Sequence, residues 1–229
     1  MATDWDAFAQ DCTWYARRRH VVVGDSGPFA QQWAGPPELD ATFPILSSLL
    51  GRARVTNLTV DSRPHVLFGW TTRRGESTGW LSPSPGRAAE VRLYPDHANL
   101  LSSFGGILER WNEPEDTWLL NLNEALTLDG SASAEFIDDY SELFTMDGVE
   151  IPIALSEWYV IAREANGNST ICNVESGSVL LFAPDHSFTH IKPLPGCPEY
   201  TLYTLEGAPD FRGWVEQVTD QWLRHVRAG

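Results

Sequence analysis

Three apolar segments follow one another in the second half of the chain and are separated only by short polar turns. They read EWYVIAREA, STICNV and SVLLFA, and the turns between them contain NGN and ESGS. Apolar runs bounded by Gly, Asn and Ser are typical of β-strands, and turns this short join antiparallel neighbours. Residues 157–182 therefore predict a three-stranded antiparallel unit.

A long amphipathic helix is predicted near the C-terminus. From Phe211 onwards, apolar residues recur at intervals of three and four, which places them on one face of a helix. Pro209 and Asp210 stand where a first turn favours them. The stripe consists of Phe211, Trp214, Val215, Val218, Trp222 and Val226. We expect this face to pack on the sheet built around residues 157–182, as part of the core.

Shorter elements are predicted along the rest of the chain. Thr3 can cap a helix whose apolar positions include Trp5 and Phe8. Strands are expected at 20–23, 52–60, 64–72, 78–82 and 89–94, helices at 44–50, 95–104 and 131–148, and a loop at 24–39. The chain is thus expected to be an α+β protein with a mostly antiparallel sheet flanked by helices. We expect residues 1–94 to form a strand-rich N-terminal half, either an extension or an additional subdomain packed on the rest, and residues 95–229 to form an α+β domain.

Negative charge is concentrated in one part of the chain. The net charge is −15, and residues 109–157 hold 13 acidic side chains against one base, Arg110. A surface of this sign makes nucleic acids and anionic membranes poor partners. It suits a basic protein partner, although a soluble acidic surface without any partner is the alternative.

Other features point to a cytoplasmic protein without a bound cofactor. The chain contains no apolar stretch of about 18 residues, and its N-terminus lacks the charge order of a signal peptide. Its three cysteines, Cys12, Cys172 and Cys197, have no CxxC spacing and are expected to be reduced thiols. The sequence carries no metal-ligand spacing and no glycine-rich phosphate loop, so we expect no metal and no cofactor.

The sequence GDSG at residues 24–27 raises the alternative of a serine hydrolase of the SGNH/GDSL type. Ser26 follows a short predicted strand near the N-terminus, as the nucleophile of those enzymes does. A nucleophilic serine needs a base and an orienting carboxylate. Asp220 and His225, the nearest such pair towards the C-terminus, lack the DxxH spacing and lie on the predicted final helix. The other interpretation of GDSG is a tight polar turn, and we expect no catalysis.

Two stretches carry a resemblance to a known family. The first, HANLLSSFGGILERW, is a predicted helix followed by Phe-Gly-Gly and an aromatic residue. The second, EWYVIAREANGNSTICNVESGSVLLFAPDH, precedes the final helix. Together they resemble the SUKH superfamily, small α+β proteins that include many bacterial immunity proteins. The resemblance covers residues 95–226, and the strand-rich residues before it are not part of the usual unit.

The resemblance implies a function as well as a fold. SUKH proteins bind partner toxins, often nucleases, and block them, so the chain is expected to be a non-enzymatic immunity protein of a toxin–antitoxin pair. A nuclease cleft is basic, and carboxylates that fill it mimic phosphates and steer association. The candidate contact residues are Glu113, Glu115, Asp116, Asp138, Asp139 and Glu142. The sequence leaves the oligomeric state open.

Overall fold

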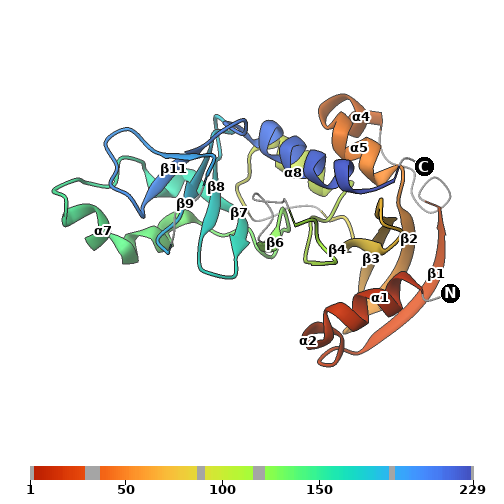
Figure 1. Cartoon of the computed structure of the whole chain (residues 1–229). Helices are drawn as coiled ribbons and strands as arrows, with labels where there is room; N and C mark the ends of the chain where they lie inside the picture. Colours follow the sequence, from red (N-terminus) through yellow and green to blue (C-terminus); the bar gives the residue numbers. More distant parts are fainter. Residues whose placement is uncertain (1–2, 29–36, 87–90, 116–121, 186–188, 228–229) are drawn as a thin grey trace.

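The computed structural model is an α+β fold with two mostly antiparallel sheets and several helices (Figure 1). It describes residues 3–28, 37–86, 91–115, 122–185 and 189–227. Among these residues, no helix is long and apolar enough to cross a membrane.

The first sheet has the strand order β1-β2-β3-β4-β5, and every neighbouring pair is antiparallel. The strands are β1 (Val21–Pro28), β2 (Arg54–Val60), β3 (Arg63–Thr71), β4 (Ser77–Pro83) and β5 (Glu109–Trp111). Side chains alternate between its two faces: Leu67 packs towards Phe8 of the N-terminal helices, whereas Phe68 faces the central core. This alternation lets helices cover both faces of the sheet.

The second sheet has the order β10-β11-β9-β8-β7-β6. Its strands are β6 (Leu122–Ala125), β7 (Trp158–Glu164), β8 (Ser169–Asn173), β9 (Val179–Phe182), β10 (Ile191–Pro193) and β11 (Leu202–Leu205). The predicted unit of three strands is confirmed as β7, β8 and β9, with Gly167 and Gly177 at positive φ in the turns. Local turn chemistry was sufficient to predict this part of the fold.

Helices lie on the faces of both sheets. The first sheet is covered on one side by α1 (Asp4–Asp11) and α2 (Thr13–Ala16), and near its other side lie α4 (Pro37–Thr42) and α5 (Pro44–Leu50). The helix α6 (Pro95–Leu101) leads into β5. The outer face of the second sheet is covered by η1 (Ala134–Tyr140), α7 (Glu142–Thr145) and η2 (Leu155–Glu157). The Thr3 cap on α1 and the helix at Pro44–Leu50 were predicted and are confirmed.

The predicted final helix is confirmed as α8 (Phe211–His225), but it contacts more than the expected sheet. All six residues of its apolar stripe are buried. At its start, Pro209 accepts a hydrogen bond from Val179 of the second sheet. At its other end, the Trp222 ring lies 5.1 Å from Trp80 and 5.9 Å from Trp70 of the first sheet. A helix of this length is about 22 Å long, so one apolar stripe serves both sheets.

The prediction of a loop at 24–39 is wrong for residues 24–28 and for residues 37–39. Residues 24–28 belong to β1, where Ser26 pairs with Thr56 of β2. A bulge lies between Val23 and Ser26, because two residues there oppose one residue of β2. Polar residues in a bulge resemble a turn in sequence, and only the pairing with β2 reveals the strand. Residues 37–42 form α4, and residues 29–36 lie outside the described residues.

Two further elements differ from prediction. The strand expected at 89–94 is absent over its described part, residues 91–94, and β5 takes the edge of the first sheet instead. The helix expected at 131–148 is a 3₁₀ helix, η1, followed by the short α7. In a 3₁₀ helix side chains three apart align, so Ala134 and Ile137 both reach the sheet. The division at residue 94 stays a prediction, and β5, which lies beyond it, completes the first sheet.

A backbone bridge joins the segment before β5 to β6 of the second sheet. Ile107 and Ala125 exchange two backbone hydrogen bonds, of 2.7 and 2.8 Å. Just before this bridge, Gly106 has a φ of +91°, and a Cβ there would lie 2.5 Å from the carbonyl carbon of Leu126. The second glycine of the Phe-Gly-Gly motif therefore permits a backbone approach that no other residue allows without displacement.

A buried histidine lies next to this junction. His97 of α6 is fully buried; its Nε2 lies 3.1 Å from the Leu126 carbonyl oxygen and its Nδ1 lies 3.0 Å from the Tyr159 hydroxyl. Since a carbonyl only accepts, Nε2 carries the proton and the tyrosine hydroxyl donates to Nδ1. Burial, opposed by the Leu126 hydrogen bond, lowers the pKa of His97 from 6.5 to about 4.

This histidine predicts a loss of stability in mild acid. Between pH 7 and pH 5 the unfolded chain takes up a proton at His97 that the folded protein does not, so the free energy of unfolding falls by about 2 kcal/mol as pH falls. Urea titrations at both pH values measure the loss. His97→Gln is expected to keep both hydrogen bonds and to reduce the loss. An identical loss in the variant would contradict the prediction.

Candidate functional site

Three of the predicted contact residues lie on the outer cover of the second sheet. Asp138 and Asp139 belong to η1, Glu142 opens α7, and all three are exposed. Residues 130–157 contain no Lys, Arg or His. We call the exposed carboxylates of this segment the acidic cap: Glu135, Asp138, Asp139, Glu142, Asp147, Glu150 and Glu157. Figure 1 shows α7 at one end of the molecule.

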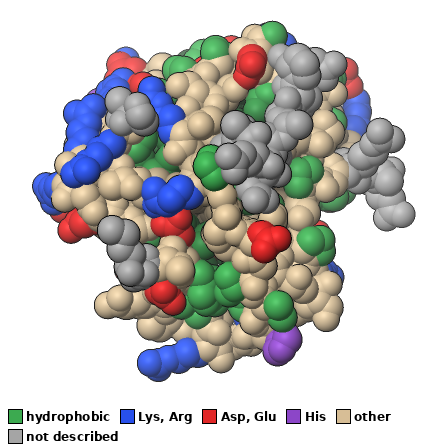
Figure 2. Space-filling model, turned by 90° about the vertical axis from the view of Figure 1, so that its right-hand side faces the viewer, with side chains coloured by type: hydrophobic (Ala, Val, Ile, Leu, Met, Phe, Trp, Pro, Cys, Tyr) green, Lys and Arg blue, Asp and Glu red, His purple; other side chains and the backbone are tan. Residues whose placement is uncertain are grey.

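The acidic cap also exposes apolar side chains. Met146, which follows α7, is 82% exposed, and Tyr140 is partly exposed with its ring 5.2 Å from Phe182 of the sheet. Large exposed apolar groups next to charges are typical of interaction surfaces. Figure 2 shows the opposite end of the molecule, where Lys and Arg side chains gather along one side. The protein therefore carries its charges unevenly.

The other predicted contact residues belong to a different place. Glu113 and Glu115 follow β5 of the first sheet, and Glu113 pairs with Arg110. They line a pocket of about 460 Å³ together with arginines such as Arg73 and Arg224. Asp116 lies outside the described residues. The acids that are close in sequence thus fall into two groups, one on each sheet. The group on the second sheet, the acidic cap, has no base within its own segment, whereas Glu113 lies close to Arg110.

Ser26 is exposed on strand β1. Its Oγ lies 2.8 Å from Oγ1 of Thr56, and among the described residues no histidine bonds to it. Asp220 pairs instead with Arg224, one turn along α8. The hydrolase alternative stays a prediction, and the described geometry assigns Ser26 a cross-strand hydrogen bond.

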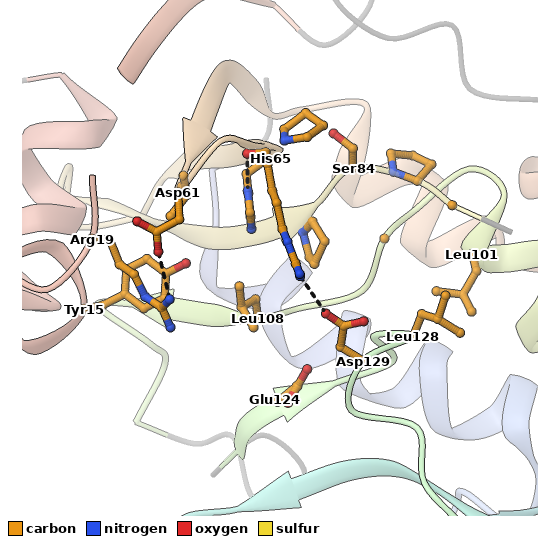
Figure 3. A pocket seen from close by; sticks show the side chains of 17 residues that line it. Tyr15, Arg19, Asp61, His65, Ser84, Leu101, Leu108, Glu124, Leu128 and Asp129 are labelled. Carbon is orange, nitrogen blue, oxygen red and sulfur yellow. Dashed lines mark hydrogen bonds and ion pairs between the residues drawn. The ribbon is translucent and has the colours of Figure 1, made fainter. Parts of the chain in front are cut away.

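A second candidate site, which we call the inter-sheet pocket, lies where the two sheets diverge (Figure 3). It has a volume of about 710 Å³, within the range of small-molecule sites. Its walls come from the β2–β3 hairpin, the end of β4, the segment before β5 and the loop after β6. The polar lining residues include Tyr15, Arg19, Asp61, Arg63, His65, Ser84, Glu124 and Asp129.

Two ion pairs border the inter-sheet pocket. Arg19 donates to Asp61 at 2.8 Å, and Arg63 to Asp129 at 3.4 Å, which links β3 of the first sheet to the loop after β6 (Figure 3). The backbone N–H of His20 and the Arg19 guanidinium lower the pKa of Asp61. Burial raises the pKa of Tyr15. The sequence gives no local signal for this pocket, because its lining residues are spread from 15 to 129.

Neither candidate site resembles a metal centre. Among the residues described, no group of three or more His, Cys, Asp or Glu side chains is arranged to hold a metal ion. The carboxylates of the acidic cap face solvent, and those of the inter-sheet pocket lie near arginines. Both arrangements suit recognition of charged groups.

Comparison with known proteins leaves the SUKH resemblance as an expectation from the sequence. No family model, no curated protein and no solved structure matches the chain.

Proposed function

We propose that the protein is a non-enzymatic binding protein of the immunity type, which neutralises a basic protein partner such as a nuclease toxin. The observation that carries the proposal is the acidic cap, in which seven exposed carboxylates share one segment without a basic residue. The cytoplasm is the compartment in which such a protein would meet its partner.

Electrostatics supports a basic partner. Charges of one sign gathered on one surface raise the rate of encounter with a surface of the opposite sign. None of the described residues forms an ion pair with Asp138, Asp139 or Glu142. Their charges are therefore available to a partner rather than used within the fold.

Packing supports the same surface. Ile137 and Phe144 are fully buried against the second sheet, so the backbone that carries the carboxylates is held in place before any partner arrives. A preformed surface loses less entropy on binding than a flexible one. Met146 supplies apolar area that a partner would cover.

Charge reversal tests the proposal. The triple variant Asp138→Lys, Asp139→Lys, Glu142→Lys should associate at least roughly tenfold more slowly with the partner at low salt, because encounter is steered by charge. The difference should shrink as salt is added, since the Debye length falls to about 8 Å at 0.15 M. Stopped-flow binding to the partner provides the rates.

The matched control changes the net charge equally elsewhere. Asp25, Glu76 and Glu199 are exposed, lie outside the acidic cap and form no ion pair among the described residues. Reversing these three to Lys should alter association much less. Equal binding by both triple variants, without salt dependence, would make the acidic cap a solubility feature and refute the proposal.

A further inference from the structure

We propose that the inter-sheet pocket binds an organic monocation, a guanidinium or primary ammonium group carried on a short apolar stem. The inference goes beyond the proposed function and uses none of the acidic cap. It rests on the unused hydrogen-bonding atoms in the pocket, on its charge and on its apolar walls.

His65 provides an acceptor inside the pocket. Only 8% of its surface is exposed, and its Nδ1 lies 2.9 Å from the backbone oxygen of Arg63. Because that oxygen only accepts, Nδ1 carries a proton, and in the matching neutral tautomer Nε2 is an acceptor. Figure 3 shows the ring entering the pocket from β3. Among the described residues Nε2 has no hydrogen-bond partner, so it is available to a donor on a ligand.

Tyr15 provides a second polar group from the opposite side. It is 6% exposed, and its hydroxyl has no hydrogen-bond partner among the described residues. Figure 3 shows this hydroxyl directed towards the pocket from α2, with Leu108 between Tyr15 and the far wall. Two side chains that are each more than 90% buried therefore present polar atoms to the same cavity.

The charge of the lining favours a cation. The carboxylates of Asp61, Glu124 and Asp129 outnumber the two arginines of the lining, so the acidic side chains and the arginines sum to −1. A single positive charge neutralises this pocket, and an anion would increase its imbalance. The rest of the wall is apolar and suits a hydrocarbon stem; it includes Val60, Pro64, Pro83, Pro85, Leu101, Leu108 and Leu128.

Arg63 already shows what kind of group the pocket accepts. Its guanidinium reaches across from β3 to Asp129 at 3.4 Å, and both side chains are largely exposed. A bound guanidinium or ammonium would compete with Arg63 for this carboxylate. Removing Arg63 should therefore strengthen binding of a cation, whereas it would weaken binding of an anion.

The test uses defined probes and calorimetric titration of the full chain. N-acetyl-arginine-methylamide and butylguanidinium should bind saturably, with dissociation constants of about 0.1–10 mM. The neutral isostere N-acetyl-citrulline-methylamide should bind at least roughly fivefold more weakly, because it lacks the charge. If both cations bind, the pocket recognises a cationic side chain of another protein. If only butylguanidinium binds, the pocket recognises a free small molecule.

Variants decide whether these probes occupy this pocket. Glu124→Gln retains an acceptor for the Thr127 hydroxyl but removes a charge, and should weaken binding about threefold or more. Arg63→Ala should strengthen it, while the exposed controls Asp147→Asn and Arg52→Ala should leave it unchanged. Thermal melting confirms that each variant is folded.

Four results would overturn the proposal. The first three are binding of the arginine and citrulline probes with equal affinity, weaker binding by Arg63→Ala, and no saturable binding of either cation up to about 50 mM. Tighter binding of methyl phosphate than of butylguanidinium would identify an anion site instead. None of these results bears on the charge-reversal experiment at the acidic cap, so the two proposals fail independently.

Discussion

Replacing Trp222 with alanine is expected to lower the free energy of unfolding by about 3–5 kcal/mol, the range for buried aromatic truncations. Trp222 is fully buried, and its ring packs against Trp70 and Trp80. The substitution removes a large apolar surface and leaves a cavity at the point where α8 meets the first sheet. Urea denaturation followed by circular dichroism measures the loss.

An exposed tryptophan provides the control for this prediction. Trp14 of α2 is 58% exposed, so Trp14→Ala should change stability by less than about 1 kcal/mol. If Trp222→Ala proves as mild as Trp14→Ala, α8 is peripheral to the core and the central role assigned to it here is wrong.

Gly106→Ala should destabilise the protein by about 2–5 kcal/mol, from a strained backbone and from a steric collision. The added Cβ would lie 2.5 Å from the carbonyl carbon of Leu126 and 2.6 Å from the backbone nitrogen of Thr127. Both are backbone atoms directly after β6, so relief requires a shift of the main chain at this junction. Thermal and urea denaturation measure the effect.

Two other glycines separate the cost of the backbone angle from the cost of the steric collision. Gly148 has a φ of +70° but open space around its missing Cβ, so Gly148→Ala reports the cost of the backbone angle alone, about 1–2 kcal/mol. Gly86 has neither constraint, and Gly86→Ala should be close to neutral. If Gly106→Ala costs no more than Gly148→Ala, the close approach at the junction is not as tight as described.

Elements specified by local sequence were predictable from the chain alone. The strands β7, β8 and β9 follow from turns with glycine, α8 follows from a stripe at helical spacing, and α1 follows from the Thr3 cap. Each depends on residues within about one or two turns of one another. The α+β class with antiparallel pairing follows from the sum of these elements.

Elements specified by distant pairing were not predictable. The GDSG segment is a strand only because β2 pairs with it across a bulge, and β5 is a strand only because it pairs with β4. The division into two sheets was also not predictable, because nothing in the sequence of β6 to β11 indicates that these strands form a sheet separate from β1 to β5.

The candidate sites also differ in how far the sequence predicts them. Composition located the acids of the cap, but burial and pairing were needed to separate Asp138 and Asp139 from Glu113, which pairs with Arg110. The inter-sheet pocket had no signal in the sequence, since Tyr15, His65 and Glu124 meet only after both sheets are assembled.

The position of α8 has a consequence for how the protein is made. It follows every strand in the sequence, yet its stripe shares one core with Trp70 and Trp80 of the first sheet and Leu181 of the second. During synthesis the part of each sheet that α8 covers therefore stays uncovered until this helix has emerged. A chain that stops before Pro209 would expose the apolar surface that α8 covers on both sheets to aggregation and proteolysis.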